Sequence, residues 1–142
     1  MARRRDPVEF FETFSAVRRC VSAVAAQSWA TLGVGSTQAK FLRYIGVNTR
    51  CSQADLARAT ATDPTLTGRI LQTLIERELV RRERSDEDRR EYVLELGAEG
   101  RRMRERVEKL RAQVVARMTA ALDERDLEDF DRITKKILAA FE

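Results

Sequence analysis

The stretch from Ser52 to Leu96 constrains the fold of this chain more than any other, because the residue pattern changes twice within it. A short helical pattern, SQADLARAT, leads through TATD into a longer helical pattern, PTLTGRILQTLIERELV. The next segment, RRERSDEDRREYVLEL, holds two strand-like runs, Val80–Arg84 and Glu91–Leu96, on either side of a charged tip. Helix, turn, helix and hairpin in this order predict a winged helix-turn-helix.

Capping residues mark where the two helices of this stretch begin. Ser52 with Asp55 three residues later is typical of a capping box, and Asp63 followed by Pro64 is typical of a helix start. At 100° per residue, the second helix has an apolar face that is expected to be buried: Leu66, Ile70, Leu71, Leu74 and Ile75, with Thr67 among them. Its opposite face is polar and suits a recognition helix: Thr65, Gly68, Arg69, Gln72 and Glu76, with Thr73 on the border.

Helical patterns also flank this stretch on both sides. One runs from Val8 to Ala30, and a second follows Ser36, a predicted N-cap, with Phe41, Leu42 and Ile45 turned inward. A long helix is expected from Ala98 to about Leu122 with Met103, Val107, Leu110, Val114 and Met118 on one seam. After a cap at Asp123 and Asp126, a last helix places six apolar residues inward: Leu127, Phe130, Ile133, Ile137, Leu138 and Phe141.

The outer helices carry more apolar surface than is needed to cover the segment Ser52–Leu96, which predicts a helical dimerisation layer. The alternative is that they close one monomeric bundle. The expected fold is mainly α with a small β-hairpin wing (α+β), in a single domain spanning 1–142. Residues 36–97 would form the winged-helix lobe, and 7–31 with 98–142 the dimerisation layer. Six residues are predicted at the dimer interface: Phe10, Phe14, Leu127, Ile133, Ile137 and Phe141.

Composition excludes several classes of chemistry. The chain has no His, which removes Ser-His-Asp and Cys-His catalysis and His-based zinc sites. With no phosphate loop, no clustered carboxylates and no metal-ligand spacing, we expect no enzyme, no cofactor and no metal. Only four of the 27 basic residues are Lys, and Arg suits forked contacts with phosphates and guanine, although a GC-rich genome would also favour Arg.

The two cysteines and the lack of an apolar run near 18 residues favour a cytoplasmic protein without a membrane partner. Cys20 is expected to be a buried thiol, and Cys51, ahead of a helix, to have a somewhat lowered pKa. Neither is expected to have a redox role. Residues 1–7, MARRRDP, form a basic arm that is either a solvated tail or a contact to a DNA backbone.

The segment LIERELVRRERSDEDRREYVLEL, with the helix start LDERDLEDF, resembles the MarR family of winged-helix transcriptional regulators. The resemblance extends over essentially the whole chain. Asp88, Arg90 and Leu94 fit the family's wing pattern of Asp, any residue, Arg, then Leu four positions on. Two residues depart from the pattern: Glu78 stands where the family usually has Gly, and Gly97 where it usually has Thr. Glu78 therefore implies a different turn or a strain of roughly 1 kcal/mol.

The resemblance implies that the second helix of the motif enters a DNA major groove. Arg69 would then contact a guanine edge or a phosphate, Gln72 an adenine edge, and Thr65 and Thr73 a base or a phosphate. In the wing, Asp88 and Arg90 would brace the loop while Arg89 reaches the minor groove, with Arg90 close to the DNA. The helix N-termini would hold phosphate through Ser36, Thr37, Ser52 and Gln53, unless these residues serve only as caps.

The resemblance also implies a cleft for a small aromatic or anionic effector. Its candidate lining is Trp29, Phe41, Tyr44 and Met103, with Arg18 or Arg19 as an anion partner; the alternative is that these aromatics belong to the core. The predicted function is a homodimeric regulator, a repressor on a pseudo-palindromic site of double-stranded DNA, released by the effector. The alternative is a winged-helix protein-interaction module without specific DNA binding.

Overall fold

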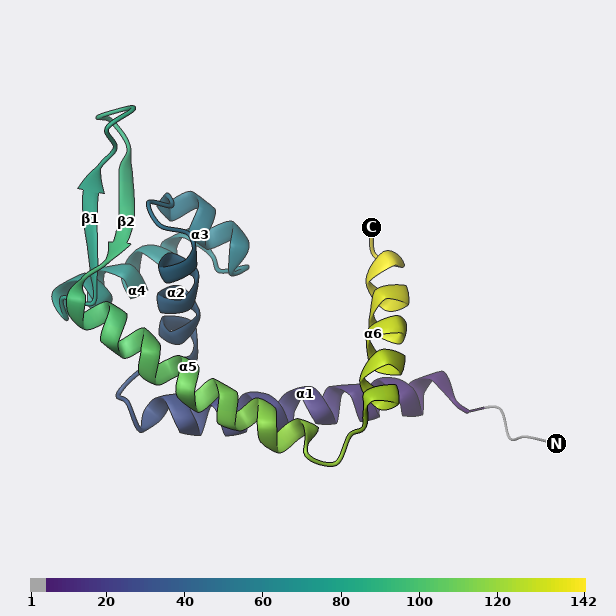
Figure 1. Ribbon diagram of the computed structural model, residues 1–142. Coiled ribbons are helices and arrows are strands. Elements are labelled where there is room, and N and C mark those ends of the chain that lie inside the picture. Colours follow the sequence, from purple (N-terminus) through teal and green to yellow (C-terminus); the bar gives the residue numbers. More distant parts are fainter. Residues whose placement is uncertain (1–4) are drawn as a thin grey trace. The chain divides into compact units, whose positions relative to one another are not determined.

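The computed structural model describes residues 5–142 and contains, within them, six helices and one two-stranded sheet (Figure 1). The elements in chain order are α1 (Pro7–Ala30), α2 (Ser36–Val47), α3 (Gln53–Ala59), α4 (Pro64–Glu76), β1 (Val80–Arg84), β2 (Tyr92–Leu96), α5 (Ala98–Thr119) and α6 (Glu124–Ala139). The fold class predicted from the sequence, mainly α with a β-hairpin wing, is confirmed. Residues 1–4, the first part of the expected basic arm, lie outside the described residues; Asp6 and Pro7 cap and begin α1.

The chain forms two compact units, one up to Arg111 and one from Ala112 onward. The first unit holds α1 to α4, the hairpin and the larger part of α5, and the second holds the rest of α5 and α6. None of the helices between residues 5 and 142 has both the length and the apolar character required to cross a membrane.

Local capping explains where α3 and α4 begin. The Ser52 hydroxyl accepts from the Asp55 N–H at 3.0 Å, and the Asp55 carboxylate accepts from the Ser52 N–H at 3.2 Å. The Asp63 carboxylate accepts from the Leu66 N–H at 3.0 Å ahead of Pro64. These caps satisfy N–H groups that have no partner within the helix, and they confirm both predicted starts.

The predicted cap of α2 was wrong by one residue. Gly35 is the N-cap, and Ser36 is the first helical residue. The Gln38 side chain accepts from the Gly35 N–H at 3.0 Å, which fixes the start of the helix without a hydroxyl cap. A sequence favours Ser as a cap, but the backbone here places the glycine at that position.

The C-terminus of α4 turns in a left-handed conformation at Glu78, where φ is 60°. The Glu78 N–H donates to the Ile75 carbonyl at 2.9 Å, and the Leu79 N–H to the Leu74 carbonyl at 3.0 Å. This pair of bonds is a Schellman motif, with the buried side chains of Leu74 and Leu79 at the positions that usually pack together. The turn is therefore the one a glycine would make, and Glu78 occupies it with strain.

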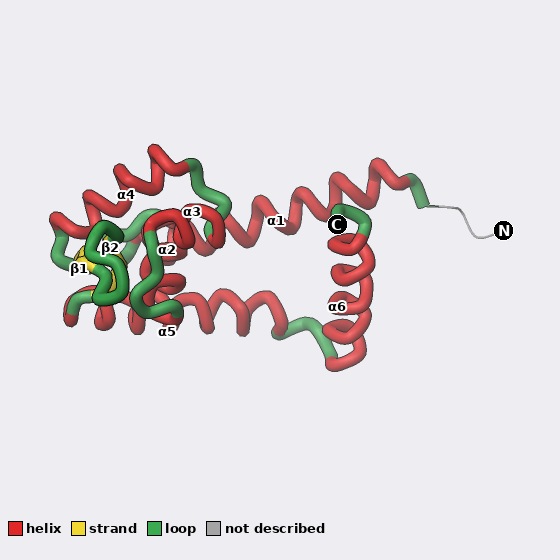
Figure 2. Tube along the Cα trace, turned by 90° about the horizontal axis from the view of Figure 1, so that it is seen from above, coloured by secondary structure: helices red, strands yellow, loops and turns green. Residues whose placement is uncertain are grey.

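The hairpin is antiparallel with Arg81 opposite Glu95 and Glu83 opposite Val93. Cys51 forms an isolated antiparallel bridge with Leu94, so the turn before α3 pairs with β2 at one residue. In Figure 2 the two strands are seen nearly end-on, beside α2 and α4 of the same unit. Leu94 and Leu96 are buried, whereas Tyr92, two residues earlier on the same face of the strand, is exposed near the tip.

One apolar core joins the helices of the first unit to the base of the hairpin. Its completely buried side chains come from α2, α3, α4, both strands and α5: Phe41, Leu42, Ile45, Leu56, Leu71, Leu74, Val80, Leu94 and Val107, together with Thr67. Met103 and Leu110 of α5 pack against this core. Leu66 was expected in it but is 45% exposed, because the first turn of α4 extends beyond the packed layer.

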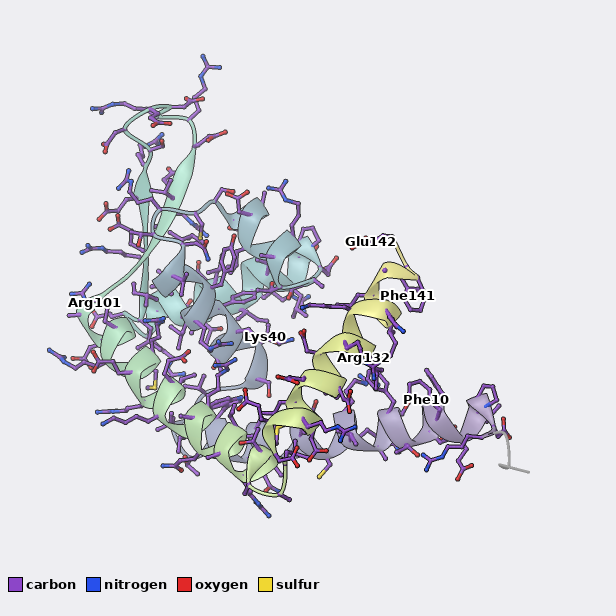
Figure 3. All side chains as sticks on the ribbon, turned by 45° about the vertical axis from the view of Figure 1, so that its right-hand side comes forward. Phe10, Lys40, Arg101, Arg132, Phe141 and Glu142 are labelled. Carbon is purple, nitrogen blue, oxygen red and sulfur yellow. The ribbon has the colours of Figure 1, made fainter. Side chains whose placement is uncertain are left out.

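Helices α1 and α6 differ from this core. Only Trp29 is buried on α1, and Phe10 and Phe14 stack on each other in the open with ring centroids 6.5 Å apart. No residue of α6 is buried within its own unit, so the inward packing of its apolar residues stays a prediction. Figure 3 shows the Phe141 side chain at the free end of α6.

Candidate nucleic-acid interface

The outward face of α4 presents four of the predicted contact residues together. Thr65, Arg69, Gln72 and Thr73 are all exposed on a helix that Thr67, Leu71 and Leu74 anchor in the core. The Thr73 hydroxyl donates to the Arg69 carbonyl at 3.3 Å, and the Gln72 amide donates to Glu76 at 3.2 Å. The face therefore offers a guanidinium, an amide and two hydroxyls on a rigid support, which is the set of groups that reads base edges.

The tip of the hairpin presents a second group of charged side chains. Arg89 and Arg90 are exposed, and Figure 3 shows side chains ending in nitrogen and oxygen around this tip. The Arg84 guanidinium lies 4.9 Å from the centre of the Tyr92 ring and donates to the Arg89 carbonyl. Arg84 therefore holds the loop that carries Arg89.

The predicted brace between Asp88 and Arg90 takes a different form. The Asp88 carboxylate accepts from the backbone N–H of Arg90 at 3.0 Å, and no ion pair joins the two side chains among the described residues. Ser85 adds to the brace, because its hydroxyl accepts from the N–H groups of Glu87 and Asp88 at 3.3 and 3.4 Å. Asp88 thus orders the backbone of the loop, while the Arg90 guanidinium stays exposed.

The predicted phosphate contacts at helix N-termini lie at two places. Ser36 and Thr37 begin α2, and neither is its cap. Ser52 caps α3, and Gln53 accepts from the Arg82 guanidinium of β1 at 3.3 Å. Ser52 and Gln53 line a cleft of about 1030 Å³ between α3 and the hairpin, where Asp55, Asp86, Glu87 and Glu91 provide negative charge.

Three arginines in this cleft were missed from the sequence: Arg50, Arg58 and Arg82. Arg58 pairs with Asp55 within α3, and Arg82 reaches across from β1 to Gln53. Arg50 pairs with carboxylates of the hairpin 33 to 45 residues further along the chain. The periodicity of a helix or strand relates only residues that are close in sequence. The distant partners of Arg50 therefore cannot be predicted from it.

The structure separates the candidate effector residues. Phe41 is fully buried, Trp29 is 7% exposed, and Met103 packs against the same core, which fits the alternative that these side chains are structural. Tyr44 also packs against this core, and in addition it lines a cleft of about 490 Å³ with Lys40 and Arg43. Arg18 and Arg19 are exposed on α1.

The exposure of Cys20 and the pKa of the Cys51 thiol both differ from the predictions. Cys20 is exposed on α1, because the packed layer covers only the last turns of that helix. Cys51 is buried, and desolvation together with the Asp55 charge raises the pKa of its thiol, so the lowered pKa predicted from its place ahead of a helix was wrong. Burial therefore outweighs the helix terminus at Cys51.

The two departures from the family pattern lie against each other. A Cβ atom on Gly97 would come within 2.9 Å of the Glu78 carbonyl oxygen, so a Thr at this position would force a shift. The Gly97 N–H donates to the Leu79 carbonyl at 3.0 Å, and Gly100 leaves no room for a side chain beside the same carbonyl. The start of α5 is thus set by close backbone contact rather than by a hydroxyl cap.

The fold of this chain is similar to that of known regulators. Residues 32–91 match the MarR family. A search of curated proteins found no match to the sequence. Among solved structures, a protein of unknown function from Listeria innocua is 27% identical, with a TM-score of 0.78 and 94% of each chain covered.

Two further structures share the fold at lower identity. A mutant of MarR from E. coli, complexed with operator DNA, is 19% identical with a TM-score of 0.81, covering 92% of this chain and 94% of that one. A MarR-like transcription regulator from Bacillus cereus is 12% identical with a TM-score of 0.83, covering 94% and 96%. The protein is thus a winged-helix protein with the fold of transcription regulators. The resemblance to the MarR family predicted from its residues is confirmed.

Proposed function

We propose that this protein is a sequence-specific DNA-binding transcriptional regulator. The observation that carries the proposal is the exposed polar face of α4, where Thr65, Arg69, Gln72 and Thr73 stand on a helix anchored in the core. An α-helix with such a face fits the major groove, whose base pairs present distinct donor and acceptor patterns. Similar structures include MarR from E. coli complexed with operator DNA and MepR from S. aureus bound to an oligodeoxyribonucleotide.

In this proposal the wing supplies the second contact. Arg89, at an exposed tip that Asp88, Ser85 and Arg84 hold in shape, reaches toward the minor groove. The negative potential of a narrow minor groove attracts such a guanidinium. Arg90 and the polar residues at the starts of α2 and α3 add contacts to the phosphate backbone.

The working form in this proposal is a homodimer that represses transcription from a pseudo-palindromic site. The exposed apolar residues on α1, on α6 and just after α6, among them Phe10, Phe14 and Phe141, support a second copy as the partner that covers them. Two recognition helices would then enter successive major grooves about 34–36 Å apart. A small aromatic or anionic effector that binds better to another spacing of the two helices would release the DNA.

The experiment compares capture of the protein's own promoter DNA by Arg69→Ala, Arg89→Ala and a control, Arg106→Ala, an exposed residue of α5. We expect Arg69→Ala to cost about 1–3 kcal/mol of binding and to relax sequence preference, and Arg106→Ala to have little effect. Wild-type affinity should fall steeply with salt, because phosphate contacts release counterions. If neither Arg69→Ala nor Arg89→Ala weakens capture, the protein-interaction module becomes the better reading.

A further inference from the structure

Arg50 lies in the turn between α2 and α3, outside the hairpin, yet its backbone is joined to β2. The Arg50 N–H donates to the Leu94 carbonyl at 3.2 Å, and the Leu94 N–H donates to the Cys51 carbonyl at 2.8 Å. Arg50 itself adopts a left-handed conformation with φ of 63°. An L-residue rarely adopts this conformation, so the surrounding contacts must hold Arg50 there.

The Arg50 side chain converges on three carboxylates of the hairpin. Its guanidinium lies 3.0 Å from Glu95 on β2, 3.9 Å from Glu83 on β1 and 3.4 Å from Asp86 in the wing loop. The Glu95 side chain is only 16% exposed and also pairs with Arg81 at 3.2 Å. A single guanidinium thus touches both strands and the loop between them.

The register of the hairpin explains why these groups meet. Arg81 lies opposite Glu95, and Glu83 opposite Val93, so these four residues occupy one face of the two-stranded sheet. The other face carries Leu94 and Leu96, which enter the core. The core therefore fixes the base of the wing, while Arg50 acts further out, where an isolated hairpin would be free to bend.

We propose that Arg50 is a positioning residue that fixes the direction of the wing and so the place of Arg89 on DNA. The inference rests on the proposed DNA-binding function for its second part. Without the Arg50 guanidinium, Glu83, Glu95 and Asp86 form an acidic group with Arg81 as its remaining partner. Mutual repulsion then favours an outward swing of the wing.

The first test uses the free protein and does not depend on DNA binding. Arg50→Met keeps the length of the side chain and removes its charge, and Arg102→Met, whose partner is Glu99 within α5, is the matched control. Amide hydrogen exchange is followed at Ser85, whose N–H donates to the Glu91 carbonyl at 2.9 Å, and at Leu71 in the core. Faster exchange at Ser85 with unchanged exchange at Leu71 is expected only for Arg50→Met.

Unchanged exchange at Ser85 in Arg50→Met would overturn the inference. If that variant fails to fold, Arg50→Lys retains the charge but presents one ammonium group, which cannot bridge three carboxylates. A smaller increase in exchange is then expected, again confined to the wing. An increase equally large at Leu71 would mean a general loss of stability and would also overturn the inference.

The second test is a double-mutant cycle on DNA. Arg50→Met is expected to weaken binding about tenfold in the wild-type background, and Arg102→Met much less. In an Arg89→Ala background Arg50→Met should have little further effect, because both act through the wing. An equal loss in both backgrounds would overturn the positioning role. A wild-type protein that binds no DNA would refute the proposed function, while amide exchange would still decide whether Arg50 holds the wing.

Discussion

The winged-helix lobe and the outer helices differ in how far their apolar side chains are buried. In the lobe, side chains of α2, α3, α4 and the hairpin base are buried against one another, and most of the largest have essentially no exposure. On α1 and α6, residues of similar size are exposed: Phe11 and Phe130 are each 63% exposed, and Phe141, two residues past the end of α6, is 86% exposed. The lobe therefore buries its apolar side chains within one compact unit, whereas many apolar side chains of α1 and α6 are exposed.

This difference predicts that the two regions contribute to different properties of the protein, the lobe to folding and the outer helices to association. Apolar faces as large as those of α1 and α6 are rare on a monomer and usually mark an interaction surface. A change in the lobe should then act on the stability of the fold, and a change on the outer helices on the association of copies. Four predictions test this division, beginning with the largest effect.

Phe41→Ala should destabilise the protein by about 3–5 kcal/mol, because it removes a fully buried ring and leaves a cavity. Denaturation by urea, with circular dichroism as the signal, measures the loss. The control is Phe11→Ala, whose ring is 63% exposed. An equal loss in both variants would remove the distinction between the two regions.

Phe130→Asp should abolish association while the lobe stays folded. Removal of a hot-spot side chain from an interface costs about 2 kcal/mol or more, and an unpaired charge buried there adds to that cost. Sedimentation equilibrium of wild type, Phe130→Asp and the polar control Asp129→Asn measures the change. A variant that associates as strongly as the wild type would show that this face of α6 is not the interface.

Glu78→Gly should stabilise the lobe by about 0.5–1 kcal/mol, since glycine adopts a φ of 60° without strain. The matched control is Glu76→Gly two residues earlier, at the last helical position of α4, where glycine should cost up to about 1 kcal/mol. Opposite shifts in the urea midpoint are expected. A loss in both variants would mean that the Glu78 side chain contributes more than its strain.

The smallest effect is a dependence on pH at the cap of α3. Hydrogen bonds from Ser52, with the charge of Arg58, lower the pKa of Asp55 below its ordinary value of 3.8. The folded chain then binds this proton less tightly than the unfolded chain, so the contribution is present above pH 4 and lost as the pH falls further. Melting curves of wild type and Asp55→Asn should converge in acid. A constant difference at every pH would contradict the cap's charge dependence.

Features set by neighbouring residues could be predicted from the sequence. The capping box of Ser52 and Asp55, the start at Asp63, and the buried positions Leu71 and Leu74 depend on spacings of three to four residues. The strands of the hairpin were predicted to within one residue, because alternation of period two is local as well. These elements were enough to predict the fold and the exposed face of α4.

Features set by distant contacts could not be predicted. The pairs of Arg50 with Glu83 and Glu95, and the contact between Gly97 and Glu78, join residues that no helical or strand period relates. The exposure of Leu66 and Cys20 has a similar cause, since periodicity shows which face of a helix is apolar but not how far the neighbouring layer extends. The contacts of Arg50 depend on the fold, which brings the wing beside the turn between α2 and α3.

The central claim is that α4 and the wing read a DNA sequence, and selection of bound sequences from a random pool of double-stranded DNA tests it most directly. The predicted result is a pseudo-palindromic consensus whose half-sites are centred about one helical turn apart. In the same selection Arg69→Ala should lose preference at one position of each half-site. No enrichment of any sequence by the wild-type protein would contradict the claim.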